Sequence, residues 1–469
     1  MDKYFHSVRL DAALCKGCTT CLQRCPTEAI RIRKGKAHIN PQFCIGCGEC
    51  IRVCPHHAKV AVYDKLDVME KYEYTIALPA PSLYTQFQNI ESQDIILNAL
   101  SLMGFSDVVE VSAAAELVSE VSRKYVKEHR SEIKGPFIST ACPSIVRLIT
   151  IRFPNLLPNL LPLNPPVEVA ARIGVHRAME KTGLSRDKIG TVLISPCPAK
   201  VSYAYVPQGI EKSEIDEVVA IKDIYPKLLA HMKAVAKDRD DEVAESGKIG
   251  ISWGARGGDA TGLLMDGYLA ADGMDNVIQV LEGLEDEKFH GLNFVELNAC
   301  NGGCVGGVLT VENPFVAEAR LKKLRKLMPV SVSHIDEYNP ELMDEIYHSK
   351  TIEYEPVFTI GSNLVESFAR LNRAERIERQ LPGLDCGSCG APTCKALAED
   401  IVKGEAKENN CIYYLRRQLK QLNEEVTNIT EELNENGNEH GEEELNLIKE
   451  YFSKISRQIS ELSEAGDVK

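Results

Sequence analysis

The stretch ELNACNGGCVGG, residues 296–307, puts two cysteines in a glycine-rich loop directly after an apolar segment. The letters FVELNA predict a strand, so Cys300 and Cys304 would follow the end of that strand. Two other segments have the same form: Cys142 follows PFIST and Cys197 follows TVLIS, each with an adjacent proline. Isolated buried thiols are one interpretation. The other is that three distant strand ends supply one set of four ligands.

The N-terminal region contains two further cysteine runs, CKGCTTCLQRCP at 15–26 and CIGCGECIRVCP at 44–55. Both follow C-x2-C-x2-C-x3-C-P, the spacing of two [4Fe–4S] clusters in which the fourth cysteine ligates the other cluster. The alternative, a zinc ribbon, is disfavoured by two successive runs that end in proline. This region resembles the bacterial two-cluster ferredoxin over residues 7–63. The expected ligand sets are Cys15, Cys18, Cys21 and Cys54 for one cluster, and Cys44, Cys47, Cys50 and Cys25 for the other.

A third cysteine-rich string, LDCGSCGAPTCKALAEDIVKGEAKENNC, ends at residue 411. Four thiolates could hold zinc or an iron–sulfur cluster, and spacing alone favours the cluster only moderately. The string resembles the small [4Fe–4S] domain at the N-terminus of corrinoid iron–sulfur proteins, which favours the cluster. The expected ligands are Cys386, Cys389, Cys394 and Cys411.

Twelve of the sixteen cysteines are then assigned, and the three strand-end segments contain the remaining four. These segments, in this order, resemble the signature motifs of [FeFe]-hydrogenases over roughly residues 64–372. The resemblance implies an H-cluster, a [4Fe–4S] cube joined through a cysteine sulfur to a diiron unit that carries CO, cyanide and a dithiolate amine. It implies Cys142, Cys197, Cys300 and Cys304 as ligands, with Cys304 as the bridge. The glycines around Cys304 would allow close approach to a bulky cluster.

The same resemblance assigns roles to several other side chains. Lys200 in CPAK matches a lysine that contacts a cyanide ligand, a charge-assisted hydrogen bond. Pro81 and Ser82 match a loop that touches the other cyanide. Trp253 stands where the family has an aromatic residue, although core packing explains it equally well.

The position before Cys142 departs from the family pattern. Catalytic members have a second cysteine there, which passes protons between the diiron site and a relay of Glu and Ser residues. This chain has Ala141, which cannot carry a proton, and every cysteine is otherwise assigned. In the relay itself, Pro165 and Val167 replace polar residues, and Val121 and Lys124 stand where the family has carboxylates. Ser195 and Asn298 occupy positions where methionines commonly flank the diiron unit.

Loss of the first relay member predicts slow turnover, since general acid–base assistance is typically worth about 10²–10⁴-fold. A slow enzyme suits the detection of H2 better than metabolic flux. The pattern resembles the sensory [FeFe]-hydrogenase groups, which carry the same C-terminal [4Fe–4S] domain.

Composition limits the other function classes. The chain has 469 residues, is 44% hydrophobic and has a formal net charge of −14. Residues 421–469 carry 13 acidic and 4 basic side chains, so most of the negative charge belongs to the tail. The absence of a basic stripe disfavours a nucleic-acid partner. Neither a membrane-spanning run nor an export signal is apparent in the sequence, which predicts a cytoplasmic location.

The tail has two apolar heptad seams that flank the polar segment NENGNEHGEEE. They predict either a helical hairpin that packs on its own chain or a coiled coil that forms a homodimer or binds a partner. The seam residues are Leu415, Leu419, Leu422, Val426, Ile429 and Leu433, then Leu445, Ile448, Phe452, Ile455, Ile459 and Leu462.

Together these features predict an α/β protein of four modules. They are a two-cluster ferredoxin domain (1–63), a two-lobed α/β H-cluster domain (64–372), a C-terminal [4Fe–4S] domain (373–413) and a helical tail (414–469). Three [4Fe–4S] clusters and one H-cluster are expected, with H2, protons, a redox or signalling partner and hydrogenase maturation proteins as partners. The favoured function is a low-activity [FeFe]-hydrogenase that senses H2. The alternatives are a metabolic hydrogenase with another proton path and a non-enzymatic hydrogenase-like iron–sulfur protein.

Overall fold

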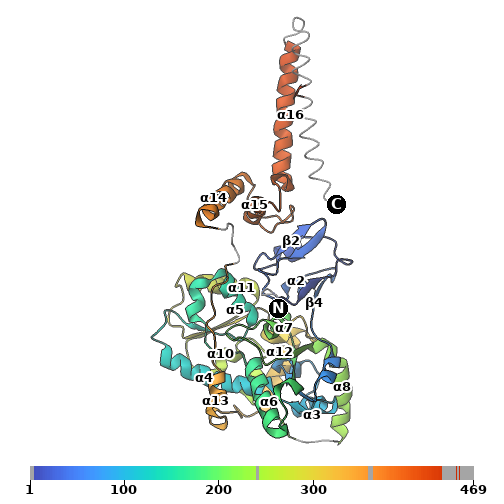
Figure 1. Ribbon diagram of the computed structural model, residues 1–469, viewed down its shortest axis with the longest axis vertical. Helices are drawn as coiled ribbons and strands as arrows, with labels where there is room; N and C mark the ends of the chain where they lie inside the picture. Colours follow the sequence, from blue (N-terminus) through green and yellow to red (C-terminus); the bar gives the residue numbers. More distant parts are fainter. Residues whose placement is uncertain (1–4, 239–241, 357–362, 436–449, 452–453, 455–469) are drawn as a thin grey trace. The chain divides into compact units, whose positions relative to one another are not determined.

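The computed structural model describes residues 5–238, 242–356, 363–435, 450–451 and 454. The chain divides into two compact units, each assembled from separate stretches of sequence. The first unit is formed by residues 1–9, 41–52 and 60–355, and the second by residues 10–40, 53–59 and 356–469. The predicted α/β class is confirmed, with helices at the C-terminal end (Figure 1).

Two parallel sheets form the framework of the first unit. The larger has the order β6-β5-β8-β9 and the smaller the order β10-β11-β7. All seven residues of β8 are buried, as expected for a parallel strand covered on both faces. The strands are β5 (Tyr74–Pro79), β6 (Asp107–Val108), β7 (Phe137–Ile138), β8 (Ile189–Ser195), β9 (Glu217–Ala220), β10 (Tyr268–Asp272) and β11 (Phe294–Asn298).

The α-helices of the first unit connect and cover these strands. They are α2 (Glu49–Arg52), α3 (Asp94–Leu102), α4 (Val111–His129), α5 (Pro143–Arg152), α6 (Pro166–Thr182), α7 (Pro198–Tyr205), α8 (Ile221–Asp238), α9 (Lys248–Ser252), α10 (Gly258–Gly262), α11 (Met274–Glu285), α12 (Pro314–Leu324) and α13 (Pro340–Glu345). The 3₁₀ helices are η1 (Leu66–Lys71), η2 (Pro81–Thr85), η3 (Pro154–Asn159), η4 (Arg186–Lys188), η5 (Gly303–Gly306), η6 (Arg325–Leu327) and η7 (Ile335–Glu337).

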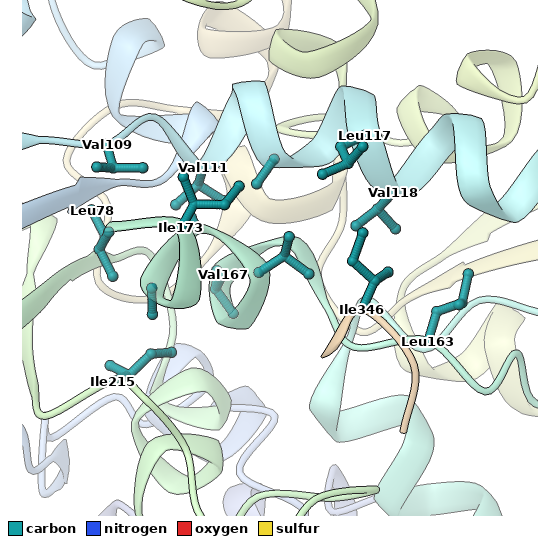
Figure 2. Close-up of a cluster of buried hydrophobic side chains, with 14 of the residues drawn as sticks. Leu78, Val109, Val111, Leu117, Val118, Leu163, Val167, Ile173, Ile215 and Ile346 are labelled. Atoms are coloured by element: carbon teal, nitrogen blue, oxygen red, sulfur yellow. The ribbon is translucent and has the colours of Figure 1, made fainter. Parts of the chain in front are cut away.

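The largest apolar cluster fills the space between α4, α6 and the larger sheet (Figure 2). Leu117 and Val118 of α4 belong to it, as do Ile173 of α6 and Leu78 of β5. Full burial of each such side chain contributes about 1.5–3 kcal/mol. The cluster therefore fixes α4 and the start of α6, both of which also line the site described below.

The second unit contains a short hairpin and the C-terminal helices. The turn between β2 (Ile30–Arg33) and β3 (Lys36–Ile39) has φ values of 50° at Lys34 and 68° at Gly35, as a type I′ turn requires. β1 (Val8–Leu10) and β4 (Lys59–Ala61) form a separate two-stranded sheet, most of whose residues belong to the first unit. The helices are α1 (Thr20–Gln23), α14 (Leu364–Gln380), α15 (Cys394–Lys403), η8 (Glu408–Asn410) and α16 (Ile412–Glu435).

The predicted first seam lies on α16, so its helical character is confirmed as far as Glu435. Most of the second seam, residues 445–462, falls outside the described residues. None of the described helices combines the length and apolar character needed to span a bilayer.

Candidate functional site

The four strand-end cysteines of the first unit lie where parallel strands end, the usual position of a site in such sheets. Cys142 follows β7 and is the N-cap residue of α5. Cys197 follows β8 and is the N-cap residue of α7. Cys300 follows β11, and Cys304 lies in η5. The three predicted strands are therefore present, and each leads to its cysteine.

The charges of these four cysteines all act on the ammonium group of Lys200, a residue that is only 7% exposed. Its Nζ donates to the Cys304 sulfur at 3.7 Å. Burial opposes the charge on Lys200, but the sulfurs of Cys304, Cys197, Cys142 and Cys300 outweigh it and raise the pKa of the lysine. Burial raises the pKa of the Cys142 and Cys304 thiols, and Lys200 partly offsets this rise. The sequence-predicted ligands and Lys200 thus form one group.

The glycines of the Cys304 loop bring its segment against the Cys197 segment. A Cβ atom at Gly307 would lie 2.2 Å from the carbonyl oxygen of Pro196, so only glycine fits. The Leu309 N–H donates to that same oxygen at 2.9 Å. Contact between two protein segments thus explains Gly307, whereas the approach of these glycines to a cluster stays a prediction.

A cavity of about 40 Å³ lies beside this group of thiols. Its volume exceeds the minimum of about 10–15 Å³ that a water molecule requires. Lining residues come from strand ends, from the starts of α6 and α7, and from α4 and α10. They are Ala80, Pro81, Val111, Ala115, Ser139, Ala141, Pro165, Pro166, Val167, Pro196, Lys200, Trp253, Asp259, Glu296, Leu297, Asn298 and Cys304.

Ala141 lines this cavity. Its methyl group can neither donate nor accept a proton, although its backbone N–H donates to the Ser139 hydroxyl at 3.2 Å. Pro165 and Val167 also line the cavity, and their assignment to relay positions stays a prediction. On α4 the lining residues are Val111 and Ala115, not Val121 or Lys124.

Two buried acids that sequence reasoning missed line the cavity. Asp259 accepts from the Ser139 hydroxyl, and its Oδ1 has no hydrogen-bond partner in the described part of the chain. Glu296 accepts from the N–H groups of Gly257 and Ala260, both at 2.9 Å. Burial, and next the charge of Glu296, raise the pKa of Asp259 well above its ordinary value. Burial likewise raises the pKa of Glu296, against the hydrogen bonds from Ala260 and Gly257.

Pro81 and Ser82 lie in η2, immediately after β5. Pro81 lines the cavity, whereas Ser82 is not among the lining residues. The Ser82 hydroxyl is fully buried and has no hydrogen-bond partner within the described residues. A buried hydroxyl without a partner is costly, so a polar group that satisfies it is expected nearby.

The cavity face of α4 is fixed by hydrogen bonds to other segments. The Ser119 hydroxyl accepts from the indole N–H of Trp253 at 2.9 Å. The buried Glu116 carboxylate accepts from five donors in two segments, the start of α9 and residues 331–333: Gly247 N, Gly250 N, Val332 N, Ser333 N and the Ser331 hydroxyl. Trp253 therefore has a polar anchor as well as a packing role.

The loop that contains Cys44, Cys47 and Cys50 packs against the strand-end cysteine segments. A Cβ atom at Gly48 would lie 2.8 Å from Val308, and one at Gly46 would lie 3.2 Å from Ala199. Arg52 of α2 donates to the carbonyl of Gly306 at 3.0 Å. Three predicted ligands of one ferredoxin cluster are thus adjacent to the predicted H-cluster segments.

The second unit contains two more groups of cysteines. The charges of Cys18, Cys54 and Cys15 act on Cys21, so this predicted tetrad is close together. In the C-terminal segment, Cys411 and Cys386 act on Cys389 in the same way. Cys25 belongs to the second unit, whereas Cys44, Cys47 and Cys50 belong to the first, and their shared cluster stays a prediction.

No three Cys, His, Asp or Glu side chains in the described ranges are arranged to hold a single metal ion. The proposed tetrads therefore depend on the proximity of their thiols and on the family matches.

Three family models match the chain. "Iron only hydrogenase large subunit, C-terminal domain" matches residues 73–268 and 265–308, together half of the chain. "4Fe-4S dicluster domain" matches residues 7–55. A family named FeS matches residues 381–413, which include the C-terminal cysteines. Iron–sulfur cofactors are therefore supported in each region that the sequence analysis assigned to them.

Individual relatives agree with these matches. The chain is 25% identical to the periplasmic [Fe] hydrogenase large subunit of Nitratidesulfovibrio vulgaris, over 67% of this chain and 88% of that protein. It is also 25% identical to iron hydrogenase 1 of Clostridium pasteurianum, over 56% of this chain and 54% of that protein.

A solved variant of [FeFe]-hydrogenase HydA1 from Chlamydomonas reinhardtii superposes with a TM-score of 0.47 at 15% identity, over 61% of this chain and 95% of that one. The sequence matches, which do not depend on this superposition, place the chain in the [FeFe]-hydrogenase family.

Proposed function

We propose that this chain is a low-activity [FeFe]-hydrogenase that acts as an H2 sensor. The observation that carries this proposal is the group formed by four thiols and Lys200 beside a cavity that Ala141 lines. The thiols supply the ligand set, and the methyl group of Ala141 removes the first proton carrier that the resemblance implies.

The residues present fit an H-cluster. The buried ammonium of Lys200 offsets the negative charge of thiolates and can donate to a cyanide ligand. The unpartnered hydroxyl of Ser82 offers a second donor, as the resemblance implies for this loop. The cofactor would be held by Cys142, Cys197, Cys300 and Cys304. When bound, it would supply the metal site at which H2 is interconverted with two protons and two electrons.

Electrons would reach this site through the ferredoxin-like clusters. The adjacency of the Cys44–Cys50 loop to the Cys197 and Cys304 segments supports transfer at that point. In total we propose three [4Fe–4S] clusters and one H-cluster. The redox signal would pass to a partner along the full length of α16.

The output helix begins at a proposed cluster ligand. The Cys411 carbonyl accepts from the N–H of Leu415 at 2.9 Å, in the first turn of α16. The seam residue Leu419 is exposed, which leaves room for a second helix. We therefore propose a homodimer or a signalling partner on this seam. Light scattering of oxidised and H2-reduced protein tests it, and an association state that does not respond to H2 argues against output through α16.

A second candidate function is a metabolic hydrogenase with another proton path, and the Asp259–Glu296 pair favours it. Both acids line the cavity, and their raised pKa values keep protons available at higher pH than ordinary carboxyls do. The Ser139 hydroxyl donates to Asp259 and accepts from the backbone N–H of Ala141, which connects this acid to the Ala141 position.

The decisive experiment combines two measurements on the chain after treatment with the diiron maturation proteins. Infrared bands of CO and cyanide are expected, and their absence would favour the non-enzymatic iron–sulfur protein. The rate of H2 evolution then separates the remaining two: a rate like that of metabolic hydrogenases contradicts the sensor.

A further inference from the structure

The two halves of the ferredoxin-like region have equivalent positions at Ile30 and Lys59. CPTEAIRI at 25–32 and CPHHAKVA at 54–61 align without gaps, and Ile30 begins β2 as Lys59 begins β4. In each half, a backbone N–H four residues after the last cysteine donates to its sulfur at 3.3 Å, Ala29 to Cys25 and Ala58 to Cys54. An apolar residue in one half is therefore matched by a lysine in the other.

Lys59 is as buried as its apolar counterpart. Its exposed fraction is 3%, against 2% for Ile30. Within the described part of the chain, the Lys59 ammonium has no hydrogen-bond partner. A buried cation is costly unless an anion compensates it. The position thus requires a nearby negative charge.

Two cysteines are candidates for that charge. The charge of Lys59 acts on Cys21 and on Cys54, in both cases in the direction that favours the thiolate. Those two residues, with Cys15 and Cys18, are the predicted ligands of one [4Fe–4S] cluster. Four thiolates on such a cube leave a net negative charge, which increases when the cluster is reduced.

We propose that Lys59 is the buried counter-charge of the cluster on Cys15, Cys18, Cys21 and Cys54 and raises its reduction potential. This rests on the iron–sulfur part of the proposed function but not on the diiron unit. Net charge near a cluster is a main determinant of its potential, and a buried charge is poorly screened. The opposite half, with Ile30, lacks this contribution.

The position of this cluster suggests what a raised reduction potential would do. The Gln23 side chain, which lies on α1 with Cys21, donates to the Cys386 carbonyl at 3.2 Å. The Ile32 N–H donates to the Gly390 carbonyl at 2.8 Å. The cluster that Lys59 influences is therefore next to the loop of the C-terminal tetrad. A raised reduction potential would favour the reduced state of this cluster, and thus keep electrons next to the C-terminal tetrad.

The test is a redox titration, followed by electron paramagnetic resonance, of the full-length chain with its cubane clusters reconstituted and no diiron unit. Lys59→Met is expected to lower the equilibrium constant for one-electron reduction of one cluster at least tenfold, about 59 mV, and to leave the other midpoints in place. Lys16→Met is the matched control, since Lys16 lies between Cys15 and Cys18 but is exposed. It should change the same constant less than about threefold because solvent screens its charge.

Two further variants decide the result if Lys59→Met binds iron poorly. Lys59→Arg keeps the charge and should retain the cluster and its midpoint, whereas Lys59→Gln should lower the midpoint or lose the cluster. Equal midpoints in Lys59→Met and the unmodified chain, or cluster loss in all three variants, would overturn the proposal and assign Lys59 a packing role. Absence of the H-cluster affects none of these readouts, so the sensor proposal can fail independently.

Discussion

The ammonium nitrogen of Lys200, a buried residue, lies 3.7 Å from the sulfur of Cys304, which is partly buried. It places a positive charge at the thiol that the family resemblance assigns as the bridge of the H-cluster. The contact also explains why a lysine is tolerated at a buried position.

Lys200→Met is expected to lower H2 turnover about tenfold to hundredfold, because a hydrogen bond to a charged group contributes about 1.5–3 kcal/mol. The cyanide infrared bands should shift while the iron content of the cubane clusters is retained. Lys227→Met, at an exposed position of α8, serves as the control. Unchanged cyanide bands in Lys200→Met would contradict the assigned contact.

Ala141→Cys is expected to raise H2 evolution about 10²-fold, the lower end of the range for general acid–base assistance. The new thiol would line the cavity and supply the missing proton carrier. Ala141→Val is the control, since it adds volume without a proton. Equal rates in the three proteins would show that the first relay position does not limit turnover.

Asp259→Asn and Glu296→Gln are each expected to lower H2 evolution about 10²-fold if the acid pair carries protons. Their raised pKa values mean that the acid forms persist above the ordinary carboxyl range, so activity should decline as pH rises through the raised values. That decline should vanish in the double variant. Glu282→Gln, on the exposed face of α11, should leave the pH profile unchanged.

The raised pKa values of Asp259 and Glu296 also make the stability of the fold depend on pH. A carboxyl whose pKa is higher in the folded than in the unfolded state stabilises the fold most at low pH. This contribution is lost as pH rises from the ordinary value through the raised one. The free energy of unfolding, measured by denaturant titration, should therefore fall less from acidic to alkaline pH in Asp259→Asn than in the unmodified chain.

Asp400→Asn tests the contact between β2 and the C-terminal segment within the second unit. The buried Asp400 carboxylate accepts from Arg31 at 2.8 Å and from Arg33. Its loss is expected to cost roughly 1–3 kcal/mol, less than for a fully buried pair because both guanidiniums retain solvent contact. Faster hydrogen exchange of the Ile32 amide, which donates to Gly390, is the readout. Glu375→Gln, in an exposed ion pair with Arg379, is the control.

The sequence was sufficient for the features that depend on local spacing. Cys142, Cys197 and Cys300 follow strands as predicted, because an apolar run that ends at proline or glycine is a local signal. Ala141 was also identified from sequence, since it is the direct neighbour of a motif cysteine. The helical start of the tail followed from the heptad pattern of Leu415, Leu419 and Leu422.

The acid pair could not be found in this way. Asp259 and Glu296 are far apart in sequence and meet only because α10 packs beside β11. One local signal existed: Glu296 interrupts the apolar strand FVELN, and a buried carboxylate requires donors or a function. Lys59 has a similar signal in its alignment with Ile30. In neither case does the local signal identify the partner, because the charges that face Glu296 and Lys59 come from segments distant in sequence.

The position of Cys411 has a wider consequence. It is buried, it is a proposed cluster ligand, and its carbonyl accepts a hydrogen bond from the first turn of α16. Loss of the proposed C-terminal cluster, through iron starvation or oxygen damage, would therefore also destabilise the first turn of α16. In the proposed sensor, α16 would then respond to loss of the C-terminal cluster as well as to H2.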